Sequence, residues 1–259
     1  ASGIEIPNKE GDFYALKNVP HGEVRIKQYF SKVTNSWREM YVYTPPGYEN
    51  STEKFPVLYL LHGGGEDQTG WVSQGKANLI LDNLIAENKA KPMLIVMLDG
   101  NMSGNAGFNE NALKSFENEL KTAAIPFVES NFKVAKEAKN RALAGLSMGG
   151  LQTLYAGIKN SDMFSGIGVF SSGWWANNPT LSEPHYDFMK NNTAAINSNI
   201  KEFWISMGGK EDIAYENCKI MMKKFDQMGI KYKYSEYPGG HTWPVWRHDL
   251  FQFAPLLFN

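Results

Sequence analysis

Ser147 stands in a sequence pattern that favours nucleophilic chemistry. Residues 145–149 read Gly-Leu-Ser-Met-Gly, the G-x-S-x-G pattern of a nucleophile elbow, in which a serine occupies a sharp turn between a strand and a helix. Small residues two positions before and after the serine let the chain turn tightly, and the turn exposes the hydroxyl to a base and a substrate. Ser147 is therefore the candidate nucleophile for acyl transfer.

A serine nucleophile needs a general base, and the base needs an orienting acid. The chain has five histidines: His21, His62, His185, His241 and His248. In hydrolases built around this elbow the chain order is nucleophile, acid, histidine, which excludes the two histidines before Ser147. His185 lies in an Asn-rich segment and His248 within the last predicted helix. His241 follows two glycines after the last predicted strand, so it is the candidate base.

The acid is expected after the strand that precedes the last one. Asp212 follows the apolar run 203–207, and its neighbour Glu211 is the alternative. Asp212 would also suit the N-cap of the next helix, a role that the same side chain can combine with catalysis. It lies 65 residues after Ser147 and 29 residues before His241, which leaves room for one strand–helix unit and one strand respectively.

The tetrahedral intermediate of acyl transfer also needs amide donors for its oxyanion. The backbone N–H of Met148, directly after the nucleophile, is one candidate. The second is expected from the glycine run after an early buried strand; the Gly64 amide is favoured, and the Gly63 and Gly65 amides are the alternatives. Three glycines in a chain that also has an elbow favour an oxyanion loop over a plain tight turn.

Composition excludes several other classes of function. The 259 residues are 42% hydrophobic and 20% charged with a formal net charge of −1, which gives no general attraction to nucleic acid or anionic membranes. A single cysteine, Cys218, precludes an intrachain disulfide and is expected to be a buried thiol. The sequence has no HExxH motif, His/Cys cluster or phosphate-binding loop, so we expect no metal or other cofactor. No signal-peptide or transmembrane pattern occurs in it.

Apolar runs alternate with helical patterns and must position these residues. Residues 23–44 alternate as an antiparallel hairpin that turns near 34–36. Continuous apolar runs, typical of strands buried on both faces, follow at 56–62, 93–98, 141–144, 166–170 and 203–207, and an alternating edge strand at 231–237. Helical patterns lie between these runs. The sequence therefore predicts an α/β fold with a mostly parallel central sheet, an antiparallel N-terminal hairpin and helices on both faces.

We expect one domain over 1–259, because this length suits one large α/β domain better than two small ones. Residues 1–22 form an irregular lead-in. Two insertions, at 99–112 and at 173–200, are rich in Asn and leave the carboxyl ends of predicted strands, where open α/β sheets bind ligands. The insertion at 173–200 is therefore expected near the active site.

These motifs together resemble the esterase D-like branch of the α/β-hydrolases. They comprise the run 59–65 followed by Trp71, the elbow 145–150, Gly208-x-x-x-Asp212, and Gly239-Gly240-His241 followed by Val245-Trp246. Within that branch the sequence is most similar to carbohydrate esterase family 1, the feruloyl and acetylxylan esterases of xylan-degrading bacteria. The resemblance runs from about residue 23 to the C-terminus.

The resemblance implies an α/β-hydrolase fold and hydrolysis of ester groups on plant cell-wall arabinoxylan. Ser147 would attack the ester, His241 would transfer protons, and Asp212 would orient His241. Gly64 and Met148 would form the oxyanion hole. The resemblance also implies a secreted or periplasmic bacterial enzyme that acts on feruloylated xylan, in a native polypeptide that can include a xylanase or carbohydrate-binding module.

Four tryptophans flank the predicted active-site segments: Trp71, Trp174, Trp175 and Trp243. Phenolic acids and sugars both present faces that stack on such rings. Core packing explains each ring about equally well, and the Trp174–Trp175 pair at the start of an insertion is the favoured substrate contact. Together the rings favour a feruloyl group over an acetyl group.

Three alternatives to a feruloyl esterase remain open at this point. Two are enzymatic: an acetylxylan esterase, and another esterase D-like ester or thioester hydrolase. The siderophore esterases among the latter are disfavoured, because the chain has no obvious basic patch for an anionic siderophore. The third is a non-catalytic carbohydrate-binding protein on the same fold. Such proteins typically lack one member of the triad, whereas all three candidates are present here.

Overall fold

The computed structural model describes residues 9–102 and 108–259. The predicted lead-in at 1–22 and the insertion at 99–112 thus lie partly outside the described residues. Within the described part the lead-in contains one 3₁₀ turn, η1 (Lys9–Tyr14), before the first strand.

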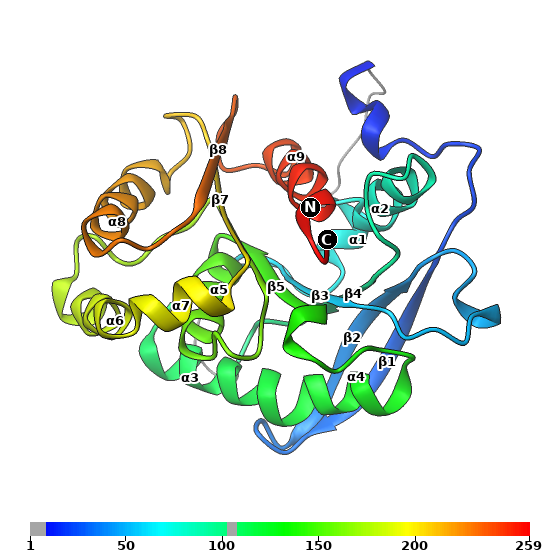
Figure 1. The fold of residues 1–259 in the computed structure, drawn as a ribbon, viewed down its shortest axis with the longest axis horizontal. Coiled ribbons are helices and arrows are strands. Elements are labelled where there is room, and N and C mark those ends of the chain that lie inside the picture. Colours follow the sequence, from blue (N-terminus) through cyan, green and yellow to red (C-terminus); the bar gives the residue numbers. More distant parts are fainter. Residues whose placement is uncertain (1–8, 103–107) are drawn as a thin grey trace.

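One eight-stranded sheet runs through the molecule in the order β1-β2-β4-β3-β5-β6-β7-β8 (Figure 1). Pairing is antiparallel between β1 and β2 and between β2 and β4, and parallel elsewhere. The strands are β1 (Glu23–Ser31), β2 (Ser36–Thr44), β3 (Val57–Leu61), β4 (Leu94–Leu98), β5 (Arg141–Leu146), β6 (Gly166–Phe170), β7 (Glu202–Gly208) and β8 (Lys233–Tyr237). The predicted fold class, with its N-terminal hairpin and mostly parallel sheet, is confirmed.

The burial of the strands follows their sequence patterns. Every residue of β3, β4, β5 and β6 is buried, as expected for continuous apolar runs covered on both faces. In β8, at the edge of the sheet, all five residues are exposed or half-buried. The hairpin turns between β1 and β2, where Asn35 takes a positive φ of 50°.

Helices cover both faces of the sheet (Figure 1). One face packs against α1 (Gly70–Ser73), α2 (Ala77–Ala86) and α9 (Trp243–Phe253). The other face packs against α3 (Glu110–Glu119), α4 (Ile125–Asn131), α5 (Met148–Lys159), α6 (Pro179–Asn191), α7 (Thr193–Asn199) and α8 (Tyr215–Met228). A π-helical turn, η3 (Leu120–Ala124), joins α3 to α4, and short 3₁₀ turns lie at η2 (Tyr48–Asn50), η4 (Ala138–Asn140) and η5 (Ala254–Leu256). Each large side chain buried in these layers contributes about 1.5–3 kcal/mol of transfer free energy.

The insertion at 173–200 is largely helical rather than an extended loop. After β6 the chain runs through residues 171–178 and then forms α6 and α7 before it enters β7. The side chains of Tyr186, Met189 and Ile196 are buried against the main core cluster, which holds both helices on the sheet.

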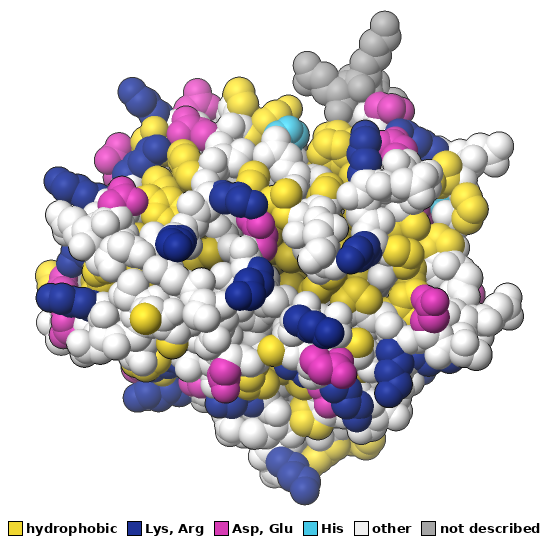
Figure 2. Space-filling model, in the orientation of Figure 1, with side chains coloured by type: hydrophobic (Ala, Val, Ile, Leu, Met, Phe, Trp, Pro, Cys, Tyr) yellow, Lys and Arg dark blue, Asp and Glu magenta, His cyan; other side chains and the backbone are white. Residues whose placement is uncertain are grey.

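The surface agrees with the near-zero net charge. Figure 2 shows Lys and Arg side chains interspersed with Asp and Glu side chains over this face of the molecule. Among the described residues, none of the helices is long and apolar enough to span a bilayer.

Candidate active site

Ser147 occupies the turn between β5 and α5 in a conformation that few residues adopt. Its φ is +50° and its ψ is −114°, so the backbone is strained in the way that functional sites often show. A Cβ at Gly145 would come within 2.5 Å of the Gly149 backbone, and one at Gly149 within 2.5 Å of the His62 carbonyl oxygen. Both flanking glycines are therefore required by close packing. The chain turns as the G-x-S-x-G pattern predicts.

The structure brings His241 and Asp212 into contact. His241 Nδ1 lies 2.8 Å from Asp212 Oδ1. Asp212 is 3% exposed, whereas Glu211 is exposed, so Asp212 is the carboxylate that pairs with His241. Of the two acids that the sequence left open, only Asp212 can therefore orient the imidazole.

Three further groups hold the Asp212 carboxylate in place. The hydroxyl of Ser171 donates to Oδ2 at 2.6 Å, the backbone N–H of Ala214 donates to Oδ1 at 2.9 Å, and the backbone N–H of Gly208 donates to Oδ2 at 3.3 Å. Burial raises the pKa of Asp212, but the hydrogen bonds with His241, Ser171 and Ala214 outweigh it and hold the pKa below its ordinary value. Asp212 is therefore ionised at neutral pH and can stabilise a protonated His241.

Ser171 was missed in the sequence because its role depends on contacts across the fold. It directly follows β6 with a positive φ of 47° and accepts a hydrogen bond from the indole N–H of Trp246 at 2.9 Å. The Trp246 ring also packs edge-on against the His241 ring, with 5.0 Å between centroids. Trp246 thus contacts His241 directly and Asp212 through Ser171. Only the position of Ser171 after a buried strand could have hinted at this role.

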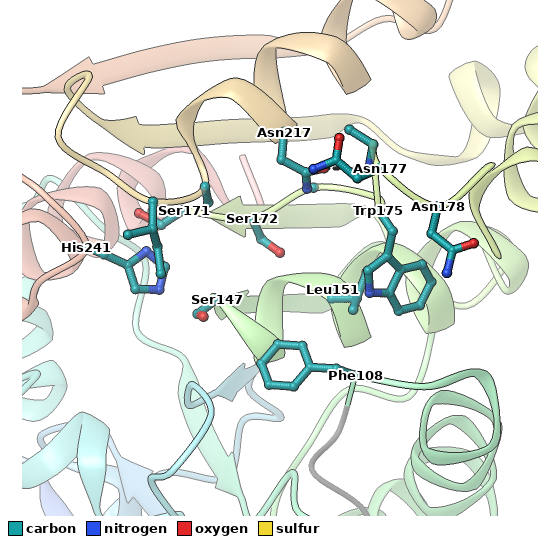
Figure 3. A pocket seen from close by; sticks show the side chains of 14 residues that line it. Phe108, Ser147, Leu151, Ser171, Ser172, Trp175, Asn177, Asn178, Asn217 and His241 are labelled. Atoms are coloured by element: carbon teal, nitrogen blue, oxygen red, sulfur yellow. Dashed lines mark hydrogen bonds between the residues drawn. The ribbon is translucent and has the colours of Figure 1, made fainter. Parts of the chain in front are cut away.

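Ser147 and His241 line the same cavity, which has a volume of about 420 Å³. Figure 3 shows the His241 ring directed toward Ser147 at one end of it. With Asp212 behind the imidazole, this arrangement has the order of groups that a serine hydrolase uses: nucleophile, base and orienting acid. The catalytic roles themselves remain predictions.

The glycine run at 63–65 lies beside the nucleophile. The Gly63 N–H donates to Glu66 Oε2 at 3.1 Å, so this amide is already engaged. The amides of Gly64 and Met148 donate to no other described group, and Met148 begins α5, where the helix dipole favours negative charge. This geometry favours Gly64 over Gly63 as the second oxyanion donor, and the assignment remains a prediction.

Glu66 is a second residue that sequence reasoning missed. Its Oε2 accepts from the Gly63 amide, and its Oε1 accepts from the indole N–H of Trp243 at 2.9 Å. Trp243 lies two residues after His241, so one carboxylate ties the glycine loop to the segment that carries the base. An acidic residue directly after three glycines was the available signal.

The four predicted tryptophan contacts divide into three kinds. Trp71 and Trp174 are each 1% exposed, which corrects their prediction as substrate contacts: Trp71 donates to the Leu61 carbonyl at 2.9 Å, and Trp174 stacks on His185. Trp243 is half-buried and packs edge-on against Trp71. Trp175 lines the cavity and presents its ring there (Figure 3).

The cavity beyond Ser147 has an apolar part and a polar part. Phe108, Leu151 and Trp175 lie together on the side away from His241 (Figure 3). Phe108 is 44% exposed and the rim residue Ile213 is 83% exposed, so the mouth of the cavity presents apolar surface to solvent. The polar lining comes from hydroxyl and amide side chains: Ser171, Ser172, Asn177, Asn178 and Asn217. The insertion at 173–200 thus contributes to the cavity through its first residues.

Across the part of the chain that the structure describes, no group of three or more His, Cys, Asp or Glu side chains is arranged to hold a metal ion.

Comparisons with known proteins agree with this geometry. A family model described as "Putative esterase" matches residues 31–257. The chain is 34% identical to the endo-1,4-beta-xylanase/feruloyl esterase of Xylanibacter ruminicola over all of its own length and 34% of that protein. It is 26% identical to the endo-1,4-beta-xylanase Y of Acetivibrio thermocellus, over 94% of its own length and 24% of that protein. The chain thus spans about a third or less of these curated relatives.

A solved structure extends the likeness to the fold. The family 1 (CE1) ferulic acid esterase of Anaeromyces mucronatus, in complex with ferulic acid, is 25% identical and superimposes with a TM-score of 0.82 over 98% of both chains. The resemblance to carbohydrate esterase family 1 that the motifs predicted is therefore confirmed.

Proposed function

The chain belongs to this esterase family, and from that premise we propose that it is a serine esterase that hydrolyses feruloyl and related hydroxycinnamoyl esters on arabinoxylan. The observation that carries the proposal is the paired His241 and Asp212 beside Ser147, at the end of a cavity with an aromatic lining.

The proposed reaction proceeds through an acyl-enzyme on Ser147. Ser147 Oγ attacks the ester carbonyl carbon while His241 accepts the hydroxyl proton, and the oxyanion is held by the amides of Gly64 and Met148. The tetrahedral intermediate then collapses, and His241 donates its proton to the departing alcohol oxygen. Water next attacks the acyl-enzyme with His241 as base. The carboxylic acid leaves and Ser147 regains its proton.

The lining of the cavity supports an aromatic acyl group over an acetyl group. An acetyl group would occupy a small fraction of about 420 Å³ and leave the rings of Phe108 and Trp175 without a partner. A planar phenolic ring can pack between such side chains, and stacked aromatic contacts contribute about 0.5–1.5 kcal/mol beyond the area they bury. The amides of Asn177 and Asn178 lie on the same side of the cavity as Trp175 and can hydrogen-bond ring substituents (Figure 3).

The polysaccharide part of the proposal draws on the relatives. Two of them are named as endo-1,4-beta-xylanases, one of these also as a feruloyl esterase, and each is far longer than this chain. We infer that the natural substrate is feruloylated xylan or its oligosaccharides. We also infer that the enzyme is secreted, since such a polymer lies outside the cell, and that a xylanase module in the same polypeptide would fit this role.

A substrate panel tests the proposal. Methyl ferulate, methyl p-coumarate, acetylated xylan and p-nitrophenyl acetate are offered to the wild type and to Ser147→Ala. We expect the wild type to prefer the hydroxycinnamoyl esters, and Ser147→Ala to fold normally and lose all hydrolysis. Turnover of acetylated xylan without ferulate release would reassign the enzyme as an acetylxylan esterase. Hydrolysis by Ser147→Ala would refute the nucleophile. An inactive wild type that binds feruloylated xylan would indicate a non-catalytic binding protein.

Phe108→Ala tests the acyl cavity separately from the catalytic groups. We expect kcat/KM for methyl ferulate to fall about tenfold, the equivalent of about 1.4 kcal/mol, while p-nitrophenyl acetate is unaffected. Ile220→Ala is the matched control, because Ile220 is 43% exposed, as Phe108 is 44% exposed, but lies on α8 outside the cavity lining. An equal loss on both substrates would contradict a role in acyl selectivity.

A further inference from the structure

A second cavity, of about 480 Å³, lies beside the β1–β2 hairpin and has no part in the proposed chemistry. Its lining comes from three segments: the start of β2, the loop after β3 and the loop after β4. Because β2 runs antiparallel to β4, the start of β2 lies at the carboxyl end of β4. The cavity therefore opens at the carboxyl ends of the parallel strands, the same end of the sheet at which Ser147 lies.

An exposed tryptophan marks this cavity. Trp37 lines it and is 71% exposed, an unusual exposure for so large an apolar ring. Its cross-strand partner Phe30 packs edge-on against it, with 5.8 Å between ring centroids at 80°. The ring is thus supported from one side by the hairpin and remains available to a ligand.

Apart from the buried Met102, the rest of the lining is polar, and several of its side chains are held in position before any ligand binds. Gln68 donates to Glu39 at 2.9 Å, and the Asn101 side chain donates to Asp99 at 2.8 Å and to the Glu66 carbonyl at 2.8 Å. Side chains fixed in this way lose little conformational entropy on binding. Carboxylate oxygens accept hydrogen bonds from the hydroxyl groups of a ligand, and side-chain amides can both accept such bonds and donate them.

The charges of the cavity disfavour an anion. The one guanidinium in the lining, that of Arg38, is largely buried; it donates to the Asn101 carbonyl at 3.1 Å and lies 3.4 Å from Glu119 and 3.8 Å from Asp99. The other charges are the carboxylates of Glu39 and Asp99, both half-buried, which repel phosphates and acidic peptides. An apolar ligand would leave these polar groups unpaired. The lining suits a neutral, polyhydroxylated ligand with an apolar face.

The glycine loop connects the two cavities. Gly63 lies beside Ser147, since a Cβ there would be 3.4 Å from Ser147 Cβ, and Gln68 lines the second cavity. The five residue steps from one to the other span at most about 18 Å. Glu66, between them, bonds to Gly63 through its side chain and to Asn101 through its carbonyl. A polymer whose ester group reaches Ser147 can therefore extend over this loop toward Trp37.

We propose that this cavity is a second carbohydrate subsite, in which Trp37 stacks on a sugar unit of the polysaccharide chain that carries the ester. Glu39, Gln68 and Asn101 would bind the hydroxyl groups of that unit. The identity of the sugar as part of a xylan chain rests on the proposed function; the carbohydrate subsite itself rests on the lining of the cavity.

Activity on a short and a long substrate tests the subsite. For Trp37→Ala we expect kcat/KM on feruloylated arabinoxylan oligosaccharides to fall about tenfold through KM, with methyl ferulate turnover unchanged; tenfold corresponds to about 1.4 kcal/mol. Gln68→Ala should act in the same direction. Ile26→Ala is the matched control, because Ile26 is 56% exposed on the same hairpin but does not line the cavity. An equal loss on both substrates, or none on the oligosaccharides, would overturn the proposal.

A binding measurement separates this proposal from the proposed function. Xylo-oligosaccharides without ester groups are titrated into Ser147→Ala and into Ser147→Ala with Trp37→Ala, with calorimetric detection. Binding that is weakened by the Trp37 change supports the subsite even if the wild type releases no ferulate. Binding that is absent, or equal in both proteins, refutes it. If Trp37→Ala instead dissociates a dimer in size-exclusion chromatography and leaves sugar binding intact, the hairpin face is an interface between copies and the subsite is refuted.

Discussion

Replacement of Ser171 by alanine is expected to impair the enzyme without touching the three groups of the proposed triad. The hydroxyl donates to the ionised Asp212 at 2.6 Å and accepts from Trp246 at 2.9 Å. A hydrogen bond to a charged group contributes about 1.5–3 kcal/mol, and a buried N–H left without an acceptor costs about 1–3 kcal/mol. Ser171→Ala should therefore unfold at a lower denaturant concentration than the wild type, and its free energy of unfolding should be lower by several kcal/mol at most.

The same substitution should reduce kcat. Asp212 stabilises the protonated form of His241 that arises in each acyl-transfer step, and Ser171 fixes one of its two oxygens. If the whole bond of about 1.5–3 kcal/mol acts in the transition state, kcat falls about 10- to 150-fold. Loss of a bond that lowers the pKa of Asp212 raises that pKa, so the part of the pH–rate profile that reports ionisation of Asp212 should move to higher pH.

The measurement is a pH profile of methyl ferulate hydrolysis together with urea unfolding, and Ser171→Gly is the matched control. Ser171 has a φ of +47°, which costs a residue with a side chain about 1–2 kcal/mol and glycine almost nothing. Ser171→Gly should thus be about 1 kcal/mol more stable than Ser171→Ala and equally slow. Wild-type kcat and an unmoved pH profile in both variants would refute the reasoning.

Three further results are expected. Glu66→Gln leaves only one acceptor oxygen for two N–H donors, so kcat should fall about tenfold with little change in KM. Because both substitutions break the same link, the effects of Glu66→Gln and Trp243→Phe on kcat should not add in the double variant, as measured by steady-state kinetics. Strict additivity would contradict the proposed link. Burial and then the charge of Asp212 raise the pKa of Asp249 well above its ordinary value, so the native state keeps a proton that the unfolded state loses. Wild-type stability should therefore fall relative to Asp249→Asn by about 1.4 kcal/mol per pH unit as pH rises from about 4 toward that pKa, as followed by urea unfolding; a constant difference would refute this. Burial raises the pKa of the Cys218 thiol to about 12, so a disulfide reagent should label it only after unfolding, and rapid labelling of the native protein would contradict its burial.

Much of the fold could be predicted because its signals are local. The apolar runs that became β3, β4 and β6 are buried on both faces, and the alternating run near the end became the edge strand β8. Burial on both faces requires an unbroken apolar run, so the pattern and the strand position have one cause. The elbow and the chain order of nucleophile, acid and histidine likewise depend on short motifs and on element order.

Other features could be decided only by packing. Trp71 and Trp175 are the same residue type in equally suggestive segments, yet one is buried in the core and the other lines the cavity. Asp212 and Glu211 are adjacent acids, and only the course of the chain after β7 turns Asp212 toward His241.

The sequence by itself therefore determined the α/β class, the order of the strands along the chain and the short list of reactive residues. The tertiary structure alone decided that Ser171 supports the acid, that Glu66 links the glycine loop to the segment after His241, and that a polar cavity lies beside Trp37. The physical reason is the distance along the chain over which each kind of signal acts. Backbone geometry and burial pattern act over a few residues, whereas these contacts join segments that only the packing of helices on the sheet brings together.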